Sequence, residues 1–478
     1  MIPFNKKKET SLSSRSGLFF ILILFLSQGC ATYYQKSIQF QEQFVQGDFV
    51  EANNTLDKNK SAAKNQNRLL YFLQKGTVLQ LLGNYEESNT YFEEAYVFLE
   101  DYKKNYGQEA VSLLINATIK TYIGEDHEVV LLHYFKAMNY LQVGAYDEAL
   151  VECRRINNKL NQFNDKYEKK KNRYKQDAFA LNLMGITYDA SGDINNAFIA
   201  YRNAYDVYKN EYQPYFNTAI PEQLKNDLLR TAYLNGFTDE LRKYEKEFGA
   251  SYTHQENKAG EMVFFWHNGL GPVKDEWSIN FFIVQGQGGV VMFVNEELGL
   301  NFPFPLPAMG SSSGGLGDLK FIRIAFPKYI ERKPYFQSGE LSINKVDFPL
   351  EMAENINEIA FKTLEDRMNR ELATSLLRLA LKQAAEAQTS KSSENLGALL
   401  SVLNAVTEKA DTRNWQTLPY SIAYARVPLA EGDNAVELKV YSPLKSRIQK
   451  EQFKFTGEKG KTIFHIYHNL ESIPPSSF

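Results

Sequence analysis

One segment of the chain carries a regular pattern of small and aromatic residues that few folds can accommodate. Residues 181–204 place small or aromatic side chains at six fixed offsets, namely Gly185, Tyr188, Gly192, Ala197, Tyr201 and Ala204. Small residues let two antiparallel helices touch closely, and the second glycine turns the chain between them. A single helical pair cannot bury its own apolar face, so the pattern predicts several pairs stacked into a curved solenoid.

The offsets match those of a tetratricopeptide repeat, and further copies precede and follow the clearest one. They are recognised by Gly76, Gly83, Phe92 and Ala95, by Ala137, Tyr140, Gly144 and Ala149, and more weakly by Gly47 with Ala52 and by Gly236. The turn glycines do not recur at a steady interval, so the repeats are interrupted. We expect an insertion or an extra helix between residues 96 and 128.

The character of the chain changes near residues 251–260, where a polar stretch ends the helical pattern. Eight β-branched or aromatic runs then predict strands; they cover residues 261–267, 290–294, 321–326, 340–346, 422–427, 434–441, 452–455 and 462–467. Residues 353–410 instead predict a helical hairpin, one helix over 353–387 and another over 394–410, with Leu372, Leu376, Leu377 and Leu381 on one face. The second half is therefore expected to be a β-sandwich, immunoglobulin-like or transthyretin-like, with a helical insertion.

The N-terminus has the order of a bacterial lipoprotein signal. Lys6, Lys7, Lys8 and Arg15 precede an apolar run from Leu18 to Leu26, and a small residue and Cys30 follow. As a helix that run would rise only about 14 Å, whereas a bilayer core is roughly 30 Å thick. We expect lipidation at Cys30; simple cleaved secretion or a short anchor are the alternatives. Ala31 resembles the outer-membrane sorting pattern, so the expected location is the outer membrane, facing the periplasm.

Three parts are therefore expected in an α+β multidomain chain. They are a signal peptide over 1–29, a TPR-like α-solenoid over 30–255 and a β-sandwich-like domain over 256–478 with its insertion near 353–410. A net charge of −3 in 478 residues gives no indication of nucleic-acid binding. If Cys30 is lipidated, Cys153 is the other of only two cysteines and no internal disulfide can form.

Two motifs are similar to those of a family of uncharacterised tetratricopeptide-containing envelope lipoproteins. The first begins Glu-Asp-His-Glu at Glu125 and ends Arg-Arg-Ile-Asn at Asn157, and the second reads Ala-Asp-Thr-Arg-Asn-Trp-Gln-Thr-Leu-Pro from Ala410, before a strand with Arg426. The sequence departs from the family at Cys153, where a small residue is usual. The resemblance implies this domain order, no established enzyme activity, and genes that neighbour those of activators of penicillin-binding proteins.

Several possible catalytic or metal sites have simpler structural interpretations. Gly310–Gly314 spells a nucleophile elbow, but the prolines before it and glycines after it favour a loop. His465 and His468 lie three apart on a strand and face opposite sides, so they cannot share a metal, and with His267 they are expected to pack. The acids from Glu125 to Glu128 are expected to favour the start of a helix rather than bind a cation. We expect no cofactor.

Two further groups also have two interpretations. Asp189, Ser191, Asp193 and Asn195 resemble a calcium loop, but the glycine falls at the fourth position and the segment is already a repeat turn. Arg154 and Arg155 either grip an anion or join neighbouring repeats, and the sequence does not separate the two. Trp415 is expected to be buried, with Asp411 and Arg413 fixing the loop around it.

The concave side of a solenoid is the expected binding surface. Counting from Gly185 and Ala137 as equivalent positions, the groove is predicted to expose six side chains, those of Tyr134, Met138, Gln142, Asn182, Ile186 and Asp189. These observations predict a non-enzymatic, lipid-anchored envelope protein that binds envelope proteins as a scaffold or assembly factor, with a link to peptidoglycan synthesis implied by the resemblance. The alternative is a ligand- or glycan-binding outer-membrane lipoprotein, because sugars stack on aromatic rings.

Overall fold

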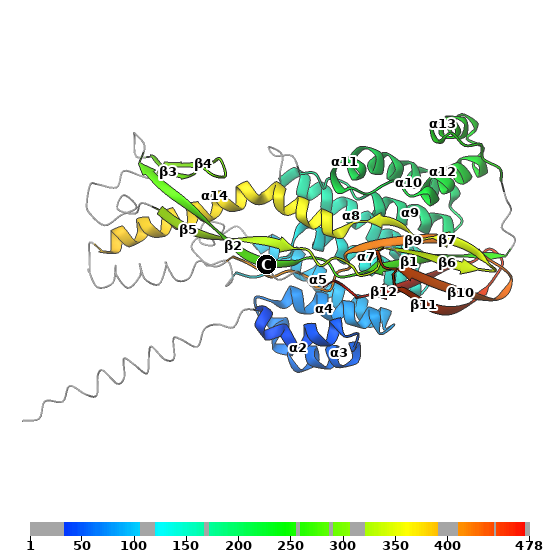
Figure 1. Ribbon diagram of the computed structural model, residues 1–478, viewed down its shortest axis with the longest axis horizontal. Coiled ribbons are helices and arrows are strands. Elements are labelled where there is room, and N and C mark those ends of the chain that lie inside the picture. The colour runs from blue at the N-terminus through cyan, green and yellow to red at the C-terminus, as the bar shows by residue number, and fades with distance from the viewer. Residues whose placement is uncertain are drawn as a thin grey trace, which may run out of the picture.

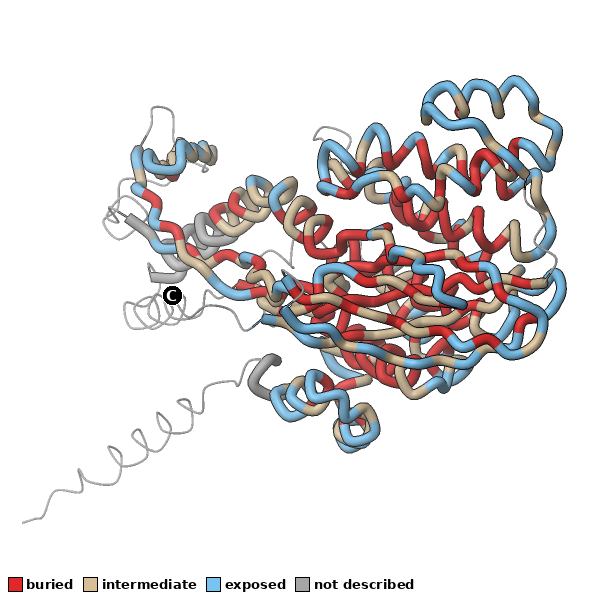
Figure 2. Tube along the Cα trace, turned by 45° about the vertical axis from the view of Figure 1, so that its right-hand side comes forward, coloured by how far each residue is buried: buried red, intermediate tan, exposed pale blue. Residues whose placement is uncertain are grey.

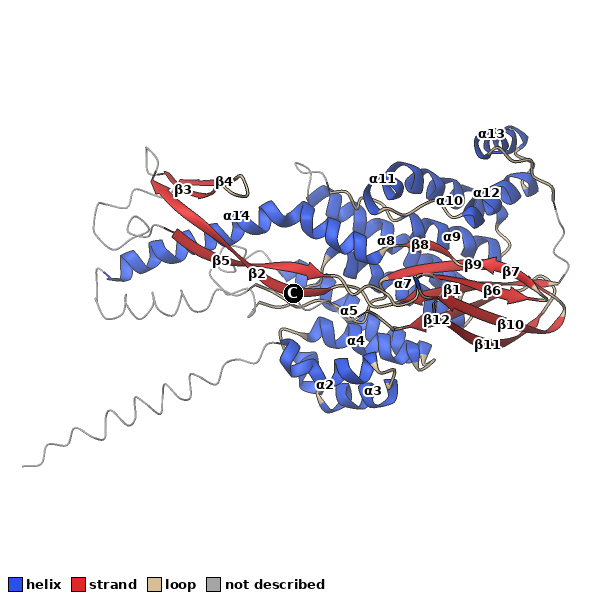
Figure 3. Cartoon of the chain, viewed as in Figure 1, coloured by secondary structure: helices blue, strands red, loops and turns tan. Residues whose placement is uncertain are grey.

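The computed structural model describes residues 33–105, 120–166, 172–254, 259–285, 290–305, 321–390, 410–443 and 446–473. Helices fill the first half and strands most of the second (Figure 1, Figure 3). The largest hydrophobic core contains residues from both halves. Figure 2 shows buried segments gathered in the middle of the molecule, where the helices meet the sheets. No described helix combines the length and the apolar character needed to cross a membrane.

The helical half consists of antiparallel pairs joined by short turns. The pairs are α2 (Tyr33–Val45) with α3 (Phe49–Lys58), α4 (Arg68–Leu81) with α5 (Tyr85–Asn105), α7 (Asp126–Gln142) with α8 (Tyr146–Lys166), α9 (Ala178–Ala190) with α10 (Ile194–Val207), and α12 (Glu222–Leu234) with α13 (Thr238–Phe248). A π-helical turn, η2 (Tyr208–Tyr212), and the short α11 (Gln213–Phe216) follow α10, and a 3₁₀ turn, η1 (Lys60–Lys64), precedes α4.

The predicted repeat residues take the positions that the pattern requires. The turn glycines Gly83, Gly144 and Gly192 have φ values of 78°, 74° and 84°, a region that L side chains rarely adopt. A Cβ added to Gly76 would lie 2.5 Å from the Phe92 ring, and one added to Gly185 would collide with the Tyr201 ring. The helix pairing predicted from these glycines is therefore confirmed. Residues 106–119, within the predicted insertion, lie outside the described part.

The β-rich half contains three four-stranded sheets. The first has the order β12-β1-β9-β8 and the second β11-β10-β6-β7. The strands are β1 (Gly260–Asn268), β6 (Ser338–Ile343), β7 (Val346–Pro349), β8 (Glu351–Glu354), β9 (Ser421–Leu429), β10 (Gly432–Tyr441), β11 (Ile448–Gly457) and β12 (Thr462–Asn469). β1 pairs parallel with β12 and antiparallel with β9, so it is a central strand of the first sheet.

The first sheet is covered on both faces. Met262, Phe264 and Trp266 of β1 belong to a core shared with the second sheet. Their neighbours Val263 and Phe265 point the other way and belong to the core shared with the helices. This double burial explains the nearly continuous apolar run of β1. The layers are thus helices, first sheet and second sheet; whether this half is immunoglobulin-like or transthyretin-like stays a prediction.

The third sheet, in the order β4-β3-β2-β5, forms an arm beside a long helix (Figure 1). Its strands are β2 (Val273–Gln285), β3 (Val290–Asn295), β4 (Leu300–Pro305) and β5 (Phe321–Ile330), and the helix is α14 (Ile356–Ser390). Leu372 and Leu376 of α14 pack on Phe281 and Ile324 of the sheet.

Two sequence predictions need correction in this region. The helix predicted to start at residue 353 starts at Ile356, because Glu351–Glu354 pairs with β9 as strand β8. The runs predicted near residues 290 and 321 form part of the separate arm, not of the two stacked sheets. All eight predicted runs contain a strand, although the run over 340–346 crosses the turn between β6 and β7; β2, β4, β8 and most of β7 were missed. The second helix predicted for residues 394–410 lies outside the described part, apart from residue 410.

Candidate functional site

Most of the six residues predicted to line an open groove are buried. Tyr134 and Asp189 contact the first sheet, whereas Gln142 contacts Tyr85 of α5. Tyr134, Met138, Asn182 and Ile186 are each exposed by 2 % or less, and Gln142 and Asp189 are partly buried. Their predicted exposure is therefore wrong. The chain's own first sheet covers the helix face that carries Tyr134 and Asp189, where a partner was expected to bind. That these six residues bind a partner stays a prediction.

Aromatic side chains make the contact between helices and sheet specific. The Tyr134 hydroxyl lies 2.8 Å from Nε2 of His267 on β1. Phe179 of α9 packs on Phe265 and on Tyr424 of β9, with ring centroids 6.2 Å and 6.3 Å apart. Burial lowers the pKa of His267 well below its ordinary value, so this imidazole is neutral in the interface.

The two motifs that carry the family resemblance meet in space. The backbone N–H of Trp415 donates to Oε1 of Glu128 at 2.6 Å, and the Trp415 ring packs on Phe92 and Phe135. Glu128 also accepts hydrogen bonds from the Tyr122 hydroxyl and from its own helix start, where it completes a capping box. Burial, with the neighbouring Glu125 charge, raises the pKa of Glu128 to about 7.

Glu125 connects three distant parts of the chain. It pairs with Lys274 of β2 and with Arg367 of α14. Burial by itself would raise the pKa of Glu125, but the two cations outweigh it and hold the pKa below the ordinary value. The acids at the start of α7 thus serve helix capping and ion pairing. Among the described residues, no group of three or more His, Cys, Asp or Glu side chains is arranged to hold a metal ion.

Arg426 of β9 is the centre of a second buried charge cluster. Its guanidinium contacts Asp189 at 2.6 Å and Asp227 of α12 at 3.0 Å, and it also pairs with Glu261 of β1. Arg230 pairs with the same two aspartates. Asp189 therefore joins the first sheet to the helices. Its carboxylate pairs with two arginines, as expected of a structural residue and not of a cation-binding loop.

The remaining predicted residues are structural or lie outside the described part. His465 contacts Phe453 between the two sheets, whereas His468 lies 4.4 Å from His267 on the helix side, so the two histidines face opposite ways as predicted. Arg155 pairs with Glu152 of its own helix at 2.8 Å and lies 3.8 Å from Glu93 of α5, so it joins neighbouring repeats. Asp411 and Arg413 form the expected pair. Gly310–Gly314 and Cys30 lie outside the described residues.

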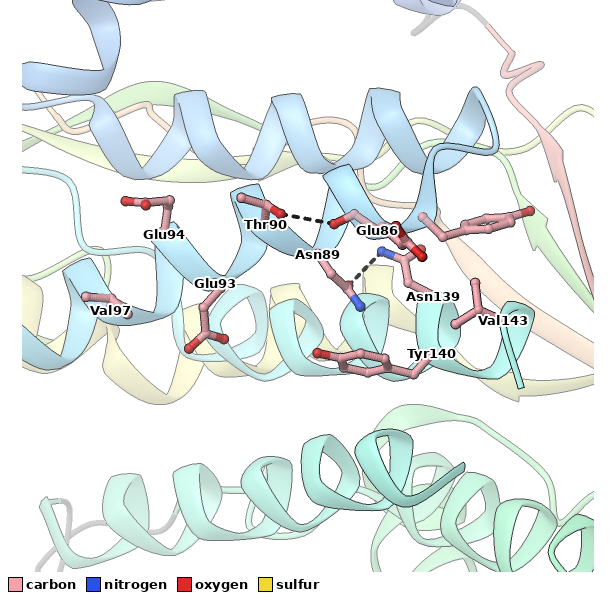
Figure 4. A pocket seen from close by; sticks show the side chains of 10 residues that line it. Glu86, Asn89, Thr90, Glu93, Glu94, Val97, Asn139, Tyr140 and Val143 are labelled. Atoms are coloured by element: carbon pink, nitrogen blue, oxygen red, sulfur yellow. Dashed lines mark hydrogen bonds between the residues drawn. The ribbon is translucent and has the colours of Figure 1, made fainter. Parts of the chain in front are cut away.

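A recess open to solvent lies between α5 and α7; we call it the α5–α7 groove (Figure 4). Its volume is about 430 Å³. It is lined by Tyr85, Glu86, Asn89, Thr90, Glu93, Glu94 and Val97 of α5 and by Asn139, Tyr140 and Val143 at the end of α7. The α5 residues recur every three or four positions, so they form one stripe along the helix. No motif in the sequence singles these residues out.

A fully buried amide network supports the floor of the groove. Asn139 donates to Oδ1 of Asn89 at 2.8 Å and to the Ser88 hydroxyl at 2.8 Å. Asn139 in turn accepts from Gln80 at 2.6 Å, and Ser88 donates to the Gly76 carbonyl at 2.7 Å. These bonds fix the Asn89 amide with its oxygen toward Asn139 and its nitrogen toward the recess (Figure 4).

The carboxylates of the groove differ in their pairing. Glu93 pairs with Lys136, whose ammonium group is buried and also contacts Glu152 at 2.8 Å. Glu86 and Glu94 are exposed, and within the described ranges neither carboxylate has an ion-pair partner. No lysine or arginine lines the recess. The groove therefore combines uncompensated negative charge with an amide donor and the rings of Tyr85 and Tyr140.

No protein-family model matches the chain, and no curated protein matches it. Similar solved structures include MamA from Desulfovibrio magneticus RS-1, 17% identical over 45% of this chain and 89% of that one, with a TM-score of 0.28. A Podosopora anserina putative kinesin light chain with TPR-like repeats is 13% identical over 44% of this chain and 90% of that one, with a TM-score of 0.30. The apo form of RapI is 12% identical over 48% and 58%, with a TM-score of 0.34. Scores this low carry no inference about this protein.

Proposed function

We propose that this chain is a non-enzymatic, lipid-anchored envelope protein that binds other proteins as a scaffold or assembly factor. One helix face is covered by the first sheet, whereas the α5–α7 groove is open to solvent. This contrast is the observation that carries the proposal. The helices and the first sheet share one core, so the chain presents a single stable body. On that body the groove offers charge, hydrogen-bonding groups and aromatic rings to solvent.

The proposed lipid anchor and the proposed cellular location are both inferred from the sequence. The basic head, the short apolar run and Cys30 support lipidation, and Ala31 supports the outer membrane facing the periplasm. A link to peptidoglycan synthesis rests on the family resemblance alone. The alternative, a glycan-binding lipoprotein, draws on Tyr85 and Tyr140, whose rings a sugar could stack against.

Site-specific photo-crosslinking in living cells tests the scaffold. We would place a photo-reactive amino acid at Val143, at the end of the groove, and for comparison at Ile448, which is 49% exposed on the distant strand β11. We expect one envelope protein, identified by mass spectrometry, to crosslink at Val143 and not at Ile448. Crosslinking at neither position, together with saturable binding in a glycan screen, would replace the scaffold by the glycan-binding alternative.

The anchor has its own test. We expect Cys30→Ser to move the protein from the membrane fraction to the soluble envelope fraction, because two or more acyl chains are what give lasting attachment. Fractionation after a high-salt wash measures this. A variant that still sediments with membranes would show that lipidation is not the anchor.

A further inference from the structure

We propose that the α5–α7 groove binds an extended segment of a protein partner that carries two basic side chains. This inference rests on the proposed function, because it gives the chemistry of the partner for the same surface. A protein segment supplies the cations that the groove lacks and a backbone carbonyl for its free amide donor.

The charge pattern is the first reason. Glu86 and Glu94 form no ion pair within the part of the chain that the structure describes, whereas Glu93 between them pairs with Lys136. Eight residues separate the two free acids, so their Cα atoms are about 12 Å apart on a helix that rises 1.5 Å per residue. In an extended chain, side chains four residues apart point to the same side and are about 13 Å apart. Two lysines or arginines at that spacing match the two acids.

The Asn89 amide is the second, independent reason. Asn89 is 9% exposed, and its oxygen is occupied by Asn139. Its amide nitrogen is directed into the recess, toward Tyr140 (Figure 4), and has no acceptor among the described residues. This nitrogen opens onto the recess, where the carbonyl of a bound backbone can accept a hydrogen bond from it. Asn89 lies between Glu86 and Glu94 on the same stripe, so a single extended segment can reach all three.

Apolar surface beside the acids favours a peptide over a small cation. Val97 and Val143 are 44% and 50% exposed at the groove, and the Tyr140 ring is half-buried there. The stems of lysine and arginine cover such surface while their charged ends reach a carboxylate. A small amine or metal ion would leave these side chains in water.

The test uses the detergent-solubilised full chain and three capped heptapeptides of alanine. The first has lysines at positions 2 and 6, the second has adjacent lysines at positions 3 and 4, and the third has glutamates at positions 2 and 6. Isothermal titration should show saturable binding of the first peptide, at least fivefold weaker binding of the second and none of the third. Binding of the first peptide should weaken as salt is raised, because exposed charges are screened.

Groove variants locate the binding. Glu86→Gln with Glu94→Gln should weaken the first peptide at least tenfold, and Asn89→Ala should weaken it severalfold. The matched control is Glu240→Gln with Glu431→Gln, which removes the same charge from α13 and the β9–β10 turn and should leave binding unchanged. Equal loss in the control, or equal binding of all peptides, would overturn the proposal. If crosslinking at Val143 captures an envelope protein while the lysine peptide does not bind, the scaffold stands and this inference fails.

Discussion

The helix–sheet interface and the α5–α7 groove both belong to the helical half of the chain, but their charges are arranged in opposite ways. At the interface, Asp189 and Asp227 are buried and meet the guanidinium of Arg426. At the groove, Glu86 and Glu94 remain exposed and unpaired among the described residues. Paired buried charges hold two parts of one chain together, whereas unpaired exposed charges are available to another molecule. The comparison separates the stabilising surface from the binding surface.

The largest expected effect comes from breaking the interface at Arg426. Arg426→Met leaves Asp189, Asp227 and Glu261 close together in a buried setting, with Arg230 as the remaining cation. Removing one partner of a buried pair costs about 3–5 kcal/mol. The free energy of unfolding in urea measures this loss.

Arg447→Met is the matched control for Arg426→Met. Arg447 pairs with Glu471, and both side chains are about half exposed. Exposed pairs contribute about 0–1 kcal/mol, so this variant should unfold almost like the wild type. Similar losses in the two variants would remove the distinction between the interface and the rest of the surface.

The next largest loss of stability is expected where the two helices of a pair are in close contact. Gly185→Ala adds a methyl group where the Tyr201 ring already lies, and Gly76→Ala does the same at Phe92. Overpacking of this kind costs about 1–3 kcal/mol, so both variants should lose stability by similar amounts. Asn195→Ala, at an exposed position of α10, should stay within about 0.5 kcal/mol of the wild type. A stable Gly185→Ala variant would contradict the close approach.

The helical repeats could be predicted because their signal is local. Gly185 and Tyr201 are sixteen residues apart in one hairpin, and their contact follows from helix geometry and side-chain size. The strands were predicted where apolar and β-branched residues run together, as in β1 and β12. Tyr134 and Asn182, predicted to be exposed in a groove, are instead buried.

The packing of the first sheet on the helices could not be predicted from local sequence patterns. Tyr134 and His267 are 133 residues apart, and nothing near either residue indicates the other. Arg426 was noted only as part of a motif, without its partners Asp189 and Asp227. The α5–α7 groove was missed because Glu86 and Glu94 look like ordinary exposed helix residues. Only the three-dimensional arrangement shows that Asn89 between them keeps an unused donor.

A smaller effect, on the pH dependence of stability, is expected where α7 contacts the third sheet. Burial lowers the pKa of His127 to about 3, with Arg367 and Lys274 opposing its protonation and Glu125 favouring it. A folded-state pKa below the unfolded value of about 6.5 means that His127 contributes stability above that pH and loses it as the pH falls toward 3. Between pH 5.5 and 4.5 this loss is about 1 kcal/mol.

His127→Gln should therefore show a flatter fall in unfolding free energy with acid than the wild type. Tyr329→Phe is the control, because it alters the ring packed on His127 without removing a group that titrates in this range. Its slope should equal that of the wild type. Parallel slopes for His127→Gln and the wild type would mean that this imidazole is not neutral and buried.

The smallest expected effect is at the groove itself. Glu86→Gln with Glu94→Gln removes two exposed charges that pair with nothing in the described structure, so the unfolding free energy should change by no more than about 0.5 kcal/mol. The unfolding free energy of this variant is measured in urea together with that of Arg426→Met, so that the groove and the interface are compared under the same conditions. A loss of several kcal/mol in the groove variant would mean that these acids stabilise the fold, and the distinction between a stabilising interface and a binding groove would no longer hold.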